Sequence, residues 1–252
     1  MHNDLFSIGP LTLHTYGLMT AIAIIAAVLF IERQMKKKQM DASCVYELAV
    51  TCLLSGYAGS KLLYLFTVLP ELLKGQIRLA DAFFGGWVVL GGILGGMAGG
   101  YLFCRRRRLP VPQMFDTAMP GIALAQGIGR IGCFFAGCCY GIRWNGPLAV
   151  SFTHSEFAPN HVPLFPSQLL SSAGDFLLFG ILLLADRRKK RDWEVTACYL
   201  LLYSLGRIAV EFFRGDLERG AVGPFSTSQF ICLFTFGAGV LMLFMIHGRS
   251  SK

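Results

Sequence analysis

The chain has 252 residues, of which 54% are hydrophobic and only 15% are charged. Soluble domains carry about 25% charged residues, so this composition excludes a water-soluble fold and indicates an integral membrane protein. Eight cysteines in a chain of this length are also too few for a disulfide-stapled secreted domain.

Seven apolar stretches are long enough to cross a membrane as helices, which takes about 20 residues each. The expected spans are, in chain order, 11–31, 45–69, 83–104, 114–135, 166–185, 195–213 and 225–247. The fourth is the weakest, because Asp116, Pro120 and several glycines interrupt it. None shows the period of two that a transmembrane β-barrel requires. The sequence therefore predicts an all-α integral membrane protein, with residues 1–252 forming a single polytopic domain of seven transmembrane helices.

Positive charges predict the orientation of these spans. Fifteen of the 23 Lys and Arg residues follow spans 1, 3, 5 and 7: Arg33, Lys36, Lys37, Lys38, Arg105, Arg106, Arg107, Arg108, Arg187, Arg188, Lys189, Lys190, Arg191, Arg249 and Lys252. Seven crossings place them all on one side, and the positive-inside rule makes that side the cytoplasm. We therefore expect the N-terminus outside and the C-terminus in the cytoplasm. This pattern accounts for the net charge of +8 without a nucleic-acid partner.

The other eight basic residues fall in the external loops or in the spans that lead to them: Lys61, Lys74, Arg78, Arg130, Arg143, Arg207, Arg214 and Arg219. A cation inside a membrane segment costs about 3 kcal/mol or more unless it is paired or hydrated. Snorkelling or an internal ion pair would explain any single one. Three together in spans 2, 4 and 6, namely Lys61, Arg130 and Arg207, predict an outward cavity that accepts an anion such as a phospholipid headgroup.

Glycines recur every four residues in the third span, at Gly91, Gly95 and Gly99. Small residues at this spacing let two helix backbones approach closely. No strand precedes them, so we interpret this run as a packing surface and not as a nucleotide-binding loop.

The segment 129–141 reads GRIGCFFAGCCYG, which resembles the signature GRIGNF-x-N-x-E-x-x-G of the prolipoprotein diacylglyceryl transferase family. Further matches follow the same order along the chain. They are Tyr16-Gly17-Leu18-Met19, Gly59-Ser60-Lys61 with Tyr64, the pairs Gly85-Gly86 and Gly91-Gly92, Pro166-Ser167-Gln168, and Arg207, Glu211 and Arg214 with Asp216. The resemblance covers nearly the whole chain.

This resemblance implies an enzyme of the bacterial inner membrane, with no cofactor and no metal. Such enzymes transfer the diacylglyceryl group of phosphatidylglycerol to the lipobox cysteine of prolipoprotein signal peptides, the first step of lipoprotein maturation. The catalytic residues it implies are Arg130, Arg207, Glu211 and Tyr16. The substrate-binding residues it implies are Arg130, Lys61, Tyr64, Arg214, Gly141, Gln168, Cys133 and Cys138.

The chemistry of these residue types fits that reaction. Arginine is permanently charged and binds phosphate with two parallel hydrogen bonds. Glu211 follows Arg207 by one helical turn, so the two are expected to pair. Tyr16 is expected to hydrogen-bond a headgroup oxygen, and Gly141 to permit a turn that a side chain would block.

Four positions depart from the family pattern. Cys133 and Cys138 replace Asn and Glu of the signature, Ala136 replaces its second Asn, and Leu90 stands where the family has His or Tyr. A thiol with a pKa of about 8.5 must lose its proton to attack, and Leu cannot accept it. Another base would be needed, for which Glu211, His14, His154 and His161 are the candidates, or the proton passes to water.

Three cysteines, Cys133, Cys138 and Cys139, gather at the end of the fourth span. Their C-x4-C-C spacing lacks the paired C-x-x-C pattern and a clear His partner, which argues against zinc. We expect a disulfide or buried thiols before redox chemistry. The alternative functions are a paralogue with the same phospholipid pocket but another acceptor or thiol-dependent chemistry, and a non-catalytic lipid-binding or transport protein, for which internal repeats would be expected.

Overall fold

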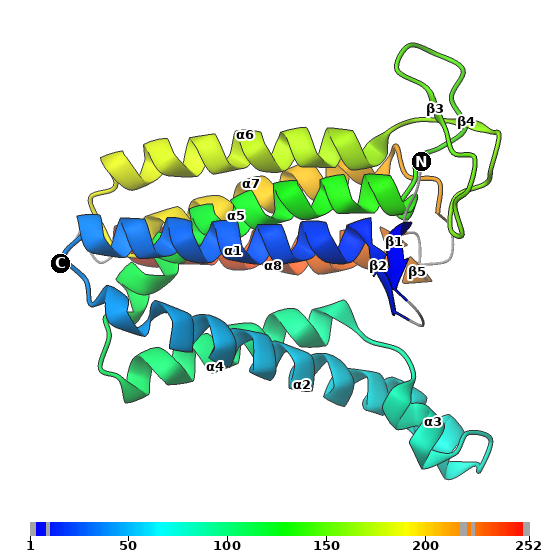
Figure 1. Ribbon diagram of the computed structural model, residues 1–252. Helices are drawn as coiled ribbons and strands as arrows, with labels where there is room; N and C mark the ends of the chain where they lie inside the picture. The colour runs from blue at the N-terminus through cyan, green and yellow to red at the C-terminus, as the bar shows by residue number, and fades with distance from the viewer. Residues whose placement is uncertain (1–3, 9–10, 217–220, 223–224, 249–252) are drawn as a thin grey trace. The chain divides into compact units, whose positions relative to one another are not determined.

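The computed structural model describes residues 4–8, 11–216, 221–222 and 225–248, so Arg219, Arg249 and Lys252 lie outside the described residues (Figure 1). The described chain is predominantly helical, as the composition predicts. Its helices are α1 (Thr15–Lys37), a 3-10 turn η1 (Ala42–Cys44), α2 (Val45–Leu73), α3 (Leu79–Phe84), α4 (Val89–Arg106), α5 (Val111–Ala136), α6 (Ser167–Arg188), α7 (Glu194–Glu211) and α8 (Thr227–Gly248).

Three short antiparallel strand pairs complete the described structure. They are β1 (Asp4–Ile8) with β2 (Leu11–His14), β3 (Val150–Ser151) with β4 (Pro163–Leu164), and β5 (Ala221–Val222) with β6 (Phe225–Ser226). The first predicted span, which begins at Leu11, therefore starts four residues too early, because helix α1 begins at Thr15. The run Leu-Thr-Leu-His at 11–14 alternates apolar and polar residues, which is the pattern of a strand.

Four of the described helical segments are long and apolar enough to cross a membrane: α1, the segment Ala42–Leu73, α6 and α8. The remaining predicted spans coincide with α4, α5 and α7, which are more polar or richer in glycine. In α7, for example, 18 residues include Glu194, Arg207 and Glu211. The third predicted span also begins too early, because Gly85 and Gly86 separate α3 from α4.

The structure divides into two compact units, of which one comprises Met35–Met114. Within it, α2 and α4 run antiparallel with their backbones in contact through glycines. A Cβ atom on Gly95 would collide with the carbonyl oxygen of Ser55 and lie 3.1 Å from Cα of Gly59, and one on Gly59 would collide with the carbonyl oxygen of Gly91. The glycine run is thus a packing surface, as its spacing predicts.

The other unit comprises residues 1–34 and 115–252 and holds α1, α5, α6, α7 and α8. Helix α5 contacts α1 through Gly121 and Gly132 and contacts α6 through Gly127, while α7 packs on both α6 and α8. Figure 1 shows β1, β2, β5 and the β3–β4 loop at one end of this bundle. The C-terminal end of α5 and the N-terminal end of α6 meet at this end.

A buried carboxylate ties the opposite end of the bundle together. Asp116 on α5 is fully buried and accepts hydrogen bonds from the backbone N–H groups of Trp193 and Thr196, both at 2.9 Å, and from Thr196 Oγ1 at 2.7 Å. Lys189 Nζ lies 3.0 Å from the same carboxylate. Asp116 therefore caps the N-terminus of α7, where free N–H groups and the helix dipole favour a negative charge. This contact explains an acidic residue in an otherwise apolar span.

Candidate functional site

The signature segment forms a tight turn at the end of α5. The helix ends at Ala136, and Gly137 follows with a φ of +75°, the left-handed conformation in which helices commonly end. Cys139 also has a positive φ, of 58°. The turn folds the chain back, so that Cys138 Sγ lies 3.8 Å from the carbonyl oxygen of Cys133.

The first turn of α6 anchors this loop. Ser167 Oγ donates to the carbonyl oxygen of Cys139 at 2.8 Å, and Gln168 Nε2 donates to that of Cys138 at 2.9 Å. Both side chains are 1% exposed. Gln168 Oε1 is buried and accepts no hydrogen bond from any described residue. A buried acceptor of this kind is costly unless a ligand pairs with it.

Gly141 provides a close backbone approach and not the turn we expected. It forms a β-bridge with Arg214, and a Cβ atom at this position would collide with the carbonyl oxygen of Phe165 and lie 2.8 Å from that of Phe213. Gly215 N–H donates to the carbonyl oxygen of Tyr140 at 3.1 Å beside this bridge. The loop after α5 is thereby fixed to the segment that follows α7.

Two of the predicted arginines are paired with acids. Arg207 Nη1 lies 2.7 Å from Glu211 Oε2, as the helical spacing predicts, and Arg207 Nη2 donates to Ser228 Oγ on α8 at 3.0 Å. Arg214 binds Asp216 through two hydrogen bonds, of 3.0 and 2.8 Å. These acids hold both guanidinium groups in place and offset part of their charge.

Arg130 on α5 differs from both. Its guanidinium donates no hydrogen bond to any residue that the structure describes, although its charge interacts with Asp175 and with Tyr203. Its five N–H donors are therefore available to a ligand. Asp175, on α6, also interacts with Arg207. Asp175 was not among the residues predicted from the sequence, although an acid inside an apolar span is itself a signal of a functional site.

Tyr16 lies in the first turn of α1, beside the same end of α5. Its ring packs over Gly132, where an added Cβ would lie 3.5 Å from Tyr16 Cδ2. Its hydroxyl interacts electrostatically with Cys133, Cys138 and Cys139. The structure thus brings Tyr16, Arg130 and the signature loop together.

The three cysteines form one cluster. Their sulfur atoms all lie within 4.8 Å of one another, and none of the three forms a disulfide. Hydrogen bonds with Cys133 and Cys139, together with burial, raise the pKa of the Cys138 thiol above its usual value. The sequence places the three cysteines together, and the left-handed turn at Gly137 brings Cys138 and Cys139 back toward Cys133 without a disulfide.

Lys61 and Tyr64 lie in the unit formed by residues 35–114. Lys61 is buried, and its Nζ donates to the carbonyl oxygens of Gly85 and Gly86 at 2.6 and 3.2 Å and lies 4.0 Å from the ring centre of Trp87. The Tyr64 ring packs against the same glycine pair. In this structure both residues fix the segment between α3 and α4.

The candidate bases lie in different surroundings. His14, His154 and His161 are exposed, whereas Glu211 is engaged by Arg207. Leu90, on α4, belongs to the unit formed by residues 35–114. None of these positions offers a free buried base.

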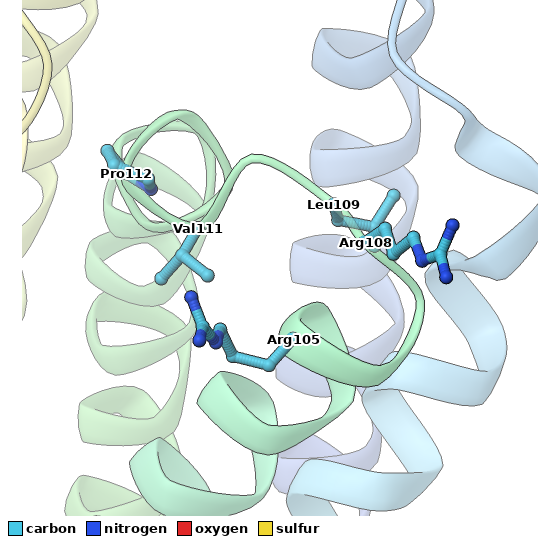
Figure 2. A pocket seen from close by; sticks show the side chains of 5 residues that line it. All are labelled: Arg105, Arg108, Leu109, Val111 and Pro112. Atoms are coloured by element: carbon cyan, nitrogen blue, oxygen red, sulfur yellow. The ribbon is translucent and has the colours of Figure 1, made fainter.

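A pocket of about 460 Å³ lies at the turn between α4 and α5, lined by Arg105, Arg108, Leu109, Val111 and Pro112. Figure 2 shows Arg105 pointing toward Val111, and Arg108 pointing away from it. None of the predicted site residues lines this pocket.

Comparison with known proteins gives one consistent match. Residues 3–245 match the prolipoprotein diacylglyceryl transferase family. A phosphatidylglycerol--prolipoprotein diacylglyceryl transferase of Clostridium tetani is 40% identical over 238 residues, which cover 94% of this chain and 95% of the relative. A second enzyme of this name from Clostridium perfringens is 36% identical, covering 92% and 90%, and one from Synechococcus elongatus is 30% identical, covering 97% and 87%.

Proposed function

Because the chain belongs to the prolipoprotein diacylglyceryl transferase family, we propose that it transfers the diacylglyceryl group of phosphatidylglycerol to the lipobox cysteine of prolipoproteins. In this reaction the cysteine sulfur bonds to the glyceryl carbon, the bond from that carbon to the phosphate oxygen breaks, and glycerol phosphate leaves. The largely buried guanidinium of Arg130, which donates no hydrogen bond to a described residue, is the observation that carries the assignment of the site.

Arg130 binds the lipid phosphate in this proposal. A phosphodiester carries one negative charge and the departing glycerol phosphate gains a second, so fixed positive charge stabilises the transition state more than the bound lipid. Arg207 and Arg214 add to that field from α7 and the segment after it, where Glu211 and Asp216 hold them. Arg130 and Arg214 both act electrostatically on Arg207, which supports one shared basic site.

Gln168 and Tyr16 contact the rest of the headgroup. The buried Oε1 of Gln168 accepts a hydrogen bond from a hydroxyl of the headgroup glycerol. Tyr16 donates its hydroxyl to a lipid oxygen next to the phosphate. Gly141, Cys133 and Cys138 shape the loop around the bound lipid, and Lys61 and Tyr64 act by ordering the segment between α3 and α4.

The enzyme spans the bacterial inner membrane seven times in this proposal, as one polytopic domain, with α4, α5 and α7 joining the four more apolar segments. The N-terminus lies outside and the C-terminus in the cytoplasm. Support comes from the bundle itself: Arg187 and Arg188 end α6, whereas Gln168 begins it beside the signature loop. The basic residues of α6 therefore lie at the end opposite the site.

A direct assay tests the function. Purified protein is mixed with phosphatidylglycerol and a lipobox peptide, and the peptide is analysed by mass spectrometry. We expect a diacylglyceryl thioether on the cysteine, and no product from a peptide with serine at that position. Absence of thioether from protein that retains its helical content would contradict the proposal.

A second candidate is a paralogue that uses the same lipid pocket with another acceptor. Leu90 and the two cysteines that replace Asn and Glu favour it. Release of glycerol phosphate from phosphatidylglycerol with an acceptor other than a lipobox peptide would support this alternative.

A further inference from the structure

The cysteine cluster has the dimensions of a metal site. Zinc binds thiolates at about 2.3 Å, which places the sulfurs of a tetrahedral site about 3.8 Å apart. The sulfurs of Cys133, Cys138 and Cys139 lie within 4.8 Å of one another. Small side-chain rotations therefore bring all three to bonding distance from one ion.

Two arginines interact electrostatically with this cluster. Three thiolates and a Zn²⁺ ion carry a net charge of −1, which is costly in a partly buried site unless cations offset it. Arg130 interacts electrostatically with Cys133 and Cys139, and Arg214 interacts with the thiol of Cys139. These two guanidinium groups offset part of the negative charge of the cluster, although Asp216 already pairs with Arg214.

The cluster leaves one coordination position open. Among the described residues, no His, Asp or Glu places a ligand atom within 4.8 Å of all three sulfurs. A zinc site with three protein ligands and an open fourth position is typical of catalytic sites, whereas structural sites have four protein ligands. No described His, Asp or Glu supplies a fourth ligand, which leaves this position open to a ligand from outside the chain.

The proposed reaction needs an activated thiol, and none of the base candidates taken from the sequence is both buried and free of an ion pair, because the histidines are exposed and Glu211 pairs with Arg207. At pH 7 a thiol with a pKa of about 8.5 is only about 3% ionised, whereas a zinc-bound thiol is deprotonated outright. We propose that Cys133, Cys138 and Cys139 bind Zn²⁺ and that the lipobox cysteine of the acceptor occupies the fourth coordination position of the ion. This inference rests on the proposed function.

The chemistry balances without any redox step. The acceptor thiol binds zinc as a thiolate and releases its proton to water. The sulfur lone pair then attacks the glyceryl carbon, the carbon–oxygen bond breaks, and its electron pair leaves with the phosphate. The thioether product is neutral and a weak zinc ligand, so it dissociates and reopens the site.

Metal content is the first test. Full-length protein, purified in detergent with a non-thiol reductant and dialysed against zinc, should contain about one zinc ion per chain. The Cys139→Ala variant should contain close to none. Cys198→Ala, which removes a thiol on α7 outside the cluster, should retain the metal of the wild type. Zinc-free wild type, or equal zinc in both variants, would overturn the site.

Cobalt spectroscopy tests the open position separately from activity. Co²⁺ in place of zinc should give a sulfur-to-metal charge-transfer band that grows by about one third when a lipobox peptide adds a fourth sulfur to three. A peptide with serine in place of cysteine should leave the band unchanged. If the cysteine peptide also leaves it unchanged, the acceptor does not bind the metal and the inference is wrong.

Turnover with and without metal separates this inference from the proposed function. Removal of zinc should lower the rate of thioether formation by about tenfold, and added zinc should restore it. Full turnover by the metal-free enzyme would overturn the zinc inference and leave the transferase function intact. Zinc binding and the cobalt response without any thioether would support the site and contradict the transferase function.

Discussion

Replacing Arg130 with lysine tests the headgroup assignment most directly. The Arg130 guanidinium has no hydrogen-bond partner among the described residues, so the substitution removes no pairing within them. Lysine keeps the charge but offers a single ammonium, which cannot form two parallel bonds to a phosphate. A lost charge-assisted hydrogen bond costs about 1.5–3 kcal/mol. We therefore expect kcat/KM for phosphatidylglycerol to fall about 10- to 100-fold.

The assay measures initial rates of thioether formation at limiting phosphatidylglycerol in mixed micelles. Arg78→Lys is the matched control, because Arg78 is 86% exposed and pairs with Asp81 on the surface. It should retain the wild-type rate. A wild-type kcat/KM for Arg130→Lys would show that this guanidinium does not hold the phosphate. If both variants lost activity to the same extent, the loss would not be specific to Arg130 and the assignment would also be wrong.

Three further predictions concern stability and topology. Asp116→Ala should lower the free energy of unfolding by about 3–5 kcal/mol, seen as a lower Tm in detergent. The substitution removes the nearer of the two carboxylates beside Lys189 and leaves the N–H groups at the start of α7 without their cap. An unchanged Tm would contradict the capping role. Gly95→Ala should lower the free energy of unfolding by about 1–3 kcal/mol, because the added Cβ forces α4 away from α2. The control is Gly237→Ala, where an added Cβ meets open space and the free energy of unfolding should not change measurably. Equal Tm values for the two variants would refute the tight packing. Reporter fusions at Arg108 and Lys252 should behave as cytoplasmic, and an external signal at either would contradict the seven-span topology.

The sequence predicts the helical elements because their signals are local. Apolar runs of about 20 residues, glycines at intervals of four and the Arg207–Glu211 spacing each act within one helix or between two neighbours. The start of the first span was predicted too early, because apolar residues occur both in transmembrane helices and in strands. Leu11 and Leu13 belong to a strand.

The site depends on contacts that no local pattern contains. Gln168 reaches the carbonyl oxygen of Cys138 from 30 residues away, and the cysteine cluster depends on a left-handed turn. Lys61 was predicted to face an anion, yet its partners in the structure are backbone carbonyl oxygens, which have no signature in the side-chain sequence. The family resemblance therefore supplies the expected site residues, while the structure shows which contacts each of them makes.

The helix contacts also imply an order in which the two units assemble during synthesis. Gly59 and Gly91 are only 32 residues apart, so α2 and α4 can pair as soon as α4 has entered the membrane. Helix α1 instead contacts α5 where Gly121 packs against Ile31, about 90 residues later. We expect the ribosome to release a complete α2–α4 hairpin while α1 still lacks its partner, which makes α1 the segment most dependent on the insertion machinery.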